Sequence, residues 1–217
     1  MIRWLVVVAA AACACALIGT LLGLPPSPID LLPAVMAQLP ASGVEHPVTA
    51  VLLNYRAYDT LLEIAVLMLA LLGILALDID APPAAPRPVE AMLSLLARLV
   101  VPVMAVMAIY LLWAGAHRPG GAFQAAAVLA AGAVMLHLGG LLGSWATPGL
   151  RLRWGIVGGF AVFLGVAATS ALHGALLELP PAAAGRLILL IESGLTVSLG
   201  LILAGLFLLL SRDREAP

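Results

Sequence analysis

Apolar residues fill six long runs of the chain, and polar or proline-containing stretches separate each run from the next. The runs are residues 2–24, 48–77, 91–113, 121–143, 155–177 and 187–210. An α-helix of about 20 apolar residues crosses the ~30 Å hydrocarbon core of a bilayer, so each run is long enough to span. The pattern predicts an all-α, polytopic integral membrane protein with about six transmembrane helices.

Two interruptions suggest how these runs are grouped. Four prolines fall between residues 81 and 88, where a continuous helix is unfavourable. We therefore predict a linker at 81–90 between a two-helix module, residues 1–80, and a four-helix module, residues 91–217. Residues 29–38 are too few to span and mix Asp30 and Gln38 with apolar side chains, which indicates a helix lying at the membrane surface.

Composition and charge narrow the class of function. The chain is 64% hydrophobic with a net charge of −1, so a nucleic-acid partner is not expected. Its two cysteines, Cys13 and Cys15, would point to different sides of a helix, so we expect no metal, disulfide or iron–sulfur cofactor. Arginines gather mainly in the stretches that lie on the same side as both termini, which predicts cytoplasmic N- and C-termini.

Charged side chains cluster at the start of the second apolar run. Arg56, Asp59 and Glu63 are spaced three and four residues apart, so one helical face would bring all three within mutual reach. One arginine can neutralise one carboxylate, and we expect the deeper Glu63 to hold and exchange a proton. The alternative is an interfacial ion pair that anchors the helix or docks a partner.

A second polar feature separates the third and fourth runs. In residues 115–123 a proline and paired glycines interrupt the helix, which exposes backbone groups that must be buried in protein or line a wet cavity. Histidine is the side chain whose ordinary charge change falls near neutral pH, so His117 could pass protons. The alternative is a hydrogen-bonding surface histidine.

Three further ionisable residues stand singly in apolar runs, namely His137, His173 and Glu192. Ionisable groups at membrane depth often mark ion pathways, and the alternative is a hydrogen bond that packs two helices together. Glycines at 155, 158 and 159 and at 194, 200 and 205 predict close helix packing.

These two motifs carry a resemblance to a known family. Residues 51–64 resemble the signature at the end of the large A subunit of Mrp-type cation/proton antiporters, or in the E-type subunit of membrane-bound hydrogenases, with matches at Arg56, Asp59, Thr60 and Glu63. Residues 115–123 resemble the G-H-x-x-P-G-G-G-F pattern of the antiporter B subunit, the MnhB domain, with matches at His117, Pro119, Gly120, Gly121 and Phe123. Ala122 departs from this pattern where the third glycine is usual.

The resemblance implies a non-catalytic subunit of a cation (Na+)/proton antiporter complex in the bacterial inner membrane. Expected partners are large A- and D-like and small C-, F- and G-like membrane subunits. Asp59 and Glu63 would carry protons or Na+ at a subunit interface, with Arg56 tuning their proton affinity and His117 and Glu192 as weaker candidates. Two alternatives stay open: a membrane-arm subunit of a redox-driven complex such as a hydrogenase, and a structural scaffold.

Overall fold

The computed structural model describes residues 2–24, 30–77, 90–142 and 149–212. Regular structure within these ranges is helical throughout, which confirms the predicted all-α class. The elements are α1 (Ile2–Leu22), α2 (Leu32–Gln38), the 3-10 helix η1 (Leu39–Ser42), α3 (Pro47–Ala50), the π-helix η2 (Val51–Tyr55), α4 (Ala57–Leu77), α5 (Ala91–Ala114), α6 (Ala122–Leu138), α7 (Leu150–His173) and α8 (Pro181–Arg212).

Helix lengths agree with a multi-pass membrane protein. Four described helices are long and apolar enough to cross a membrane, over Ala57–Ala76, Ala91–Ala114, Leu150–Leu172 and Pro181–Leu209. The first and fourth predicted spans correspond to α1 and α6, which contribute shorter apolar helices at Val7–Leu22 and Ala122–Leu138. The predicted linker at 81–90 lies outside the described residues except for Glu90, so the division into two modules remains a prediction.

The chain forms two compact units, Met1–Ala34 and Val35–Pro217. Helix α1 belongs to the first unit and exposes large apolar side chains such as Trp4 and Leu21, as expected of a helix surrounded by lipid. Helix α2 covers the second part of the predicted surface segment, and its backbone begins with a hydrogen bond from the Leu32 N–H to Asp30. Its place at the membrane surface remains a prediction.

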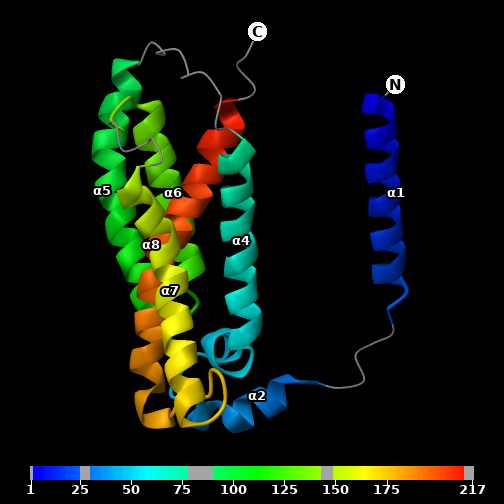
Figure 1. Ribbon diagram of the computed structural model, residues 1–217, viewed down its shortest axis with the longest axis vertical. Helices are drawn as coiled ribbons and strands as arrows, with labels where there is room; N and C mark the ends of the chain where they lie inside the picture. Colours follow the sequence, from blue (N-terminus) through cyan, green and yellow to red (C-terminus); the bar gives the residue numbers. More distant parts are fainter. Residues whose placement is uncertain (1, 25–29, 78–89, 143–148, 213–217) are drawn as a thin grey trace. The chain divides into compact units, whose positions relative to one another are not determined.

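In the second unit α8 is the central helix, and it packs against α4, α6 and α7 (Figure 1). Its buried stripe repeats every three or four residues, the spacing of one helical face. The stripe consists of Ile188, Ile191, Leu195, Leu199 and Ile202. Helix α5 packs on α6 at the side of this bundle. The α8 stripe therefore forms much of the core.

Small residues bring α7 and α8 together, as the glycine patterns predict. A Cβ added at Gly159 would lie 2.5 Å from the backbone oxygen of Gly194 and 2.6 Å from the Ser198 Cβ. The Ser198 hydroxyl donates a hydrogen bond to the Ile156 carbonyl across the same contact. Gly158 by contrast faces open space, so close packing is a property of one face of α7.

The predicted second span, residues 48–77, is not one continuous helix. It consists of α3, the π-helix η2 and α4, and Arg56 at the end of η2 leaves helical geometry with φ −125° and ψ 29°. Averaged hydropathy does not show this break because apolar stretches flank the polar residues between positions 54 and 60. Helix α4 therefore begins at Ala57, nine residues later than the sequence pattern predicts.

Candidate functional site

The break before α4 is held by hydrogen bonds that bypass the normal helical ladder. The Arg56 N–H donates to the Val51 carbonyl at 2.8 Å, which is the wider turn of a π-helix. The hydroxyl of Thr60, a buried residue, donates to the Leu52 carbonyl at 2.7 Å. Such π-helical insertions are rare and are often found at functional sites.

Arg56 and Asp59 form an ion pair at this break, and the Arg56 Nε donates to the Asp59 Oδ2 at 2.6 Å. Both side chains are largely exposed, so the pair itself contributes little to stability. Glu63 is exposed on α4 and has no hydrogen bond or ion pair within the described part of the chain. Arg56 thus neutralises Asp59 and leaves Glu63 unpaired among the described residues, and the proposed role of Glu63 in proton exchange remains a prediction.

The loop between α5 and α6 is shaped by glycines that contact backbone. A Cβ on Gly120 would lie 2.5 Å from the Leu111 carbonyl oxygen, and one on Gly115 would lie 2.6 Å from the Gly121 Cα. The Gly121 N–H donates to the same Leu111 carbonyl at 2.8 Å. Gly121 also has φ +111°, a conformation that L side chains rarely adopt. Pro119 is exposed in this loop, whereas Phe123 in the first turn of α6 packs against the core.

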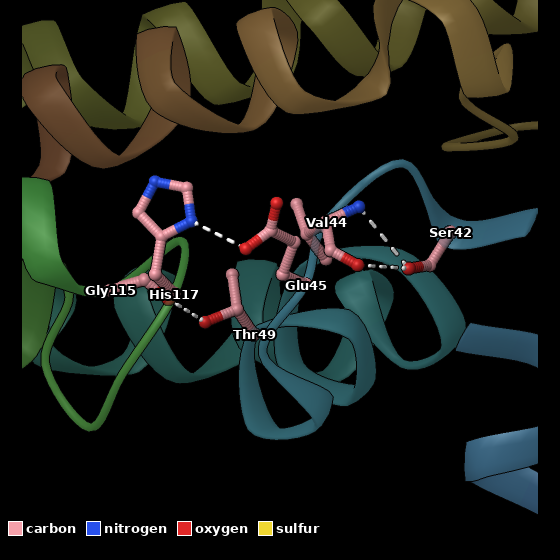
Figure 2. A network of polar contacts seen from close by, with 6 residues as sticks. All are labelled: Ser42, Val44, Glu45, Thr49, Gly115 and His117. Atoms are coloured by element: carbon pink, nitrogen blue, oxygen red, sulfur yellow. Dashed lines mark hydrogen bonds and ion pairs between the residues drawn. The ribbon is translucent and has the colours of Figure 1, made fainter. Parts of the chain in front are cut away.

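This loop docks onto the segment that precedes α4 (Figure 2). The His46 N–H donates to the Ala116 carbonyl at 3.1 Å, and the buried Thr49 hydroxyl donates to the Gly115 carbonyl. His117 Nδ1 and Glu45 Oε2 are 3.0 Å apart at the exposed edge of the same contact. The second motif therefore contacts the segment immediately before the first motif, through Glu45, His46 and Thr49, which lie outside the quoted signatures.

Glu192 is the buried carboxyl of this region, with 4% of its surface exposed. It lies about three turns into α8, roughly 17 Å along the helix axis. Its Oε1 accepts a hydrogen bond from the backbone N–H of Ala122 at 3.3 Å. Because Ala122 begins α6, the carboxyl faces the positive end of that helix dipole.

A small cavity of about 40 Å³ joins these elements. Its walls come from α3, η2 and α4, from the glycine loop and first turn of α6, and from α8. The lining residues are Val48, Thr49, Leu52, Leu53, Thr60, Gly120, Gly121, Ala122, Phe123, Gln124, Glu192 and Leu195. We call this arrangement the motif cavity, because it includes Thr60 of the first motif, three matched residues of the second, and Glu192.

The remaining candidate histidines lie at or near the C-terminal ends of α6 and α7. His137 is exposed in the last turn of α6, and His173 is the last residue of α7. Cys13 and Cys15 are free thiols on α1. Within the described ranges no group of three or more His, Cys, Asp or Glu residues is placed to hold a metal ion.

Comparison with protein families shows which family the second half of the chain resembles. The model for the domain related to the MnhB subunit of Na+/H+ antiporters matches residues 92–209. The chain belongs to this family. The MnhB-related domain contains α5, α6, α7, the glycine loop and Glu192, which confirms the resemblance inferred from residues 115–123. The segment before α5 lies outside the match, and comparison with curated proteins finds no match.

Two solved structures share the fold. One is the Mrp complex from Dietzia sp. DQ12-45-1b, with TM-score 0.71 and 22% identity over 99% of this chain. The present chain spans 27% of the length of that matched chain. The other is the membrane-bound sulfane sulfur reductase, an archaeal respiratory membrane complex, with TM-score 0.73 and 21% identity over 94% of this chain and 96% of that one. Both likenesses extend beyond the MnhB-related domain into the segment before α5.

Proposed function

We propose that this protein is a non-catalytic membrane subunit of a multisubunit Na+/H+ antiporter-type complex, and that it helps to form the ion or proton pathway. The observation that carries the proposal is the motif cavity. There the glycine loop of the MnhB-related domain and the break before α4 meet a buried carboxyl. Broken backbone and an ionisable group placed together in apolar helices are typical of ion pathways.

The exposed carboxylate of Glu63 supports a position at a subunit interface. Its neighbours on α4, Leu62 and Val66, are exposed apolar residues, so the isolated helix would place a charge among lipid-facing side chains. That arrangement is costly in hydrocarbon, and an adjoining subunit relieves the cost. We propose that Glu63 and Asp59 carry protons or Na+ at this interface. The ion pair with Arg56 would set how strongly Asp59 binds them.

The surrounding assembly follows from the same proposal. Residues 1–80 would correspond to the A-subunit or hydrogenase E-type segment, fused to the MnhB-related domain. Partners would be large A- and D-like and small C-, F- and G-like membrane subunits. The complex would lie in the bacterial inner membrane with both termini of this chain in the cytoplasm.

A second candidate function is a membrane-arm subunit of a redox-driven complex. The likeness to the archaeal respiratory membrane complex favours it, because the alignment with this chain covers 96% of the matched chain of that complex. Purification of the tagged chain in mild detergent separates the two. Co-purifying iron–sulfur proteins would support the redox-driven complex, and exclusively transport-type membrane subunits would support the antiporter.

Ion exchange by the assembled complex tests the proposal. The complex is expressed with its co-purifying subunits, and Na+-driven proton movement is followed in everted membrane vesicles. We expect Glu63→Gln to assemble normally and to reduce exchange nearly to the level of vesicles that lack the chain. The matched control is Glu90→Gln, because Glu90 is an exposed carboxylate that precedes α5. Full exchange by Glu63→Gln would instead support the scaffold alternative.

A further inference from the structure

The motif cavity contains one titratable group. Among its lining residues this group is Glu192, and the other polar side chains are Thr49, Thr60 and Gln124. Charged side chains on the adjoining elements do not line it: Arg56 and Asp59 pair with each other, His117 contacts Glu45, and Arg118 is exposed in the loop. The Glu192 carboxyl therefore faces the cavity with no basic side chain beside it.

We propose that the motif cavity is a proton-binding site, and that the Glu192 carboxyl takes up and releases the proton. The inference rests on the proposed function for the identity of the transported ions, and it assigns one of them to a particular site. In the step itself, a proton bonds to a carboxylate oxygen of Glu192 on uptake, and the same O–H bond breaks on release. No electrons are transferred.

Two influences act on this carboxyl in opposite directions. Burial in a membrane-spanning helix disfavours an unpaired negative charge. The Ala122 N–H and the N-terminus of α6 stabilise that same negative charge. A carboxyl under both influences can exist as the protonated acid or as the carboxylate, and a site that exchanges protons requires both forms.

The geometry favours a proton over Na+. The backbone N–H and the positive helix end face the carboxyl, and both repel a metal cation. The carbonyls of Gly115 and Leu52 already accept hydrogen bonds from Thr49 and Thr60, respectively. A volume of about 40 Å³ is enough for on the order of one to a few waters. A proton neutralises the carboxylate without any additional ligand.

The walls of the cavity suggest how a proton enters. Thr60 directly follows Asp59, whose carboxylate is half-exposed at the proposed subunit interface. The cavity is also lined by Gly121, whose missing side chain leaves room for the carboxyl: a Cβ there would lie 2.7 Å from Glu192 Oε1. The entry route that we propose runs past Thr60, the lining residue next to the exposed ion pair in sequence.

Infrared difference spectroscopy of the purified complex in lipid tests the site directly. Spectra of wild type, Glu192→Gln and Glu192→Asp are compared between acidic and alkaline pH, with Glu90→Gln as the control. We expect a carboxylic-acid C=O band that is present in acid, disappears in alkali, is missing in E192Q and is shifted in E192D. The control should keep the band, and replacing Na+ by K+ should leave the pH dependence of the band unchanged.

Three results would overturn the proposal. A missing band at every pH means a permanent carboxylate, and a band that persists at every pH means a structural acid. A titration that depends on Na+ means a metal-cation site. If E192Q does not assemble, the shifted band of E192D identifies the group. The proposed function fails separately, because a titrating band in a wild-type complex without Na+/H+ exchange refutes antiport and leaves the proton site intact.

Discussion

The backbone N–H of Ala122 donates a hydrogen bond to Oε1 of Glu192, 70 residues further along the chain. This contact ties the first residue of α6 to the middle of α8 and closes one side of the motif cavity. The buried acid thus helps to hold the glycine loop in place. Substitutions in the loop should therefore affect both the fold and the chemistry of the acid.

Gly121→Ala should damage this contact. The new Cβ would lie 2.7 Å from Glu192 Oε1, and Gly121 has φ +111°. Strain at such a backbone conformation costs about 1–3 kcal/mol before the clash is counted. We expect the unfolding midpoint of the purified complex to fall and the infrared band of Glu192 to shift.

Gly73→Ala serves as the control for this variant. Gly73 lies within α4 with open space around its Cβ direction, so the substitution should be neutral or slightly stabilising. Equal unfolding midpoints for both variants, together with an unchanged Glu192 band, would contradict the close contact between Gly121 and Glu192.

The helices could be predicted from hydropathy because each one coincides with a run of apolar residues that are neighbours in the sequence. The break at Arg56 could not, since Val51, Leu52 and Leu53 read as a continuation of the same span. The break depends on the Thr60 hydroxyl, which binds the Leu52 carbonyl, and on the docked glycine loop. Hydropathy averages over these specific hydrogen bonds and therefore places the helix start too early.

The candidate site could be predicted in parts but not as a unit. Glu192 and the glycine loop are each visible as exceptions within apolar sequence, but their contact depends on how α6 and α8 pack. Thr49 gave no strong signal, because a threonine near the start of an apolar run is unremarkable until its partner is known. Glu63 matched a motif, but its role stays a prediction, because Arg56 binds Asp59 and leaves Glu63 unpaired in the described part of the chain.

Thr49→Val should destabilise the contact between the glycine loop and the segment that precedes α4. The variant keeps the shape of the side chain but removes the hydroxyl that binds the Gly115 carbonyl, both residues being buried. A buried carbonyl left without a hydrogen bond costs about 1–3 kcal/mol. The loss of stability is measured by unfolding in a denaturing detergent titration. Thr49→Ser, which keeps the hydroxyl, should lose clearly less stability than Thr49→Val. Equal losses would show that the hydroxyl does not matter.

The crossing of α7 and α8 gives a prediction that is independent of the site. At Gly159→Ala the added methyl meets the Gly194 backbone oxygen at 2.5 Å and the Ser198 Cβ at 2.6 Å, and backbone cannot move aside cheaply. The helices must separate, which weakens the bond between the Ser198 hydroxyl and the Ile156 carbonyl. Overpacking of this kind costs about 1–3 kcal/mol. The adjacent Gly158→Ala, which faces open space, should be neutral or slightly stabilising. Detergent-induced unfolding should thus show a lower midpoint for Gly159→Ala and an unchanged or slightly higher one for Gly158→Ala, and a loss at Gly158 as large as that at Gly159 would refute the close crossing.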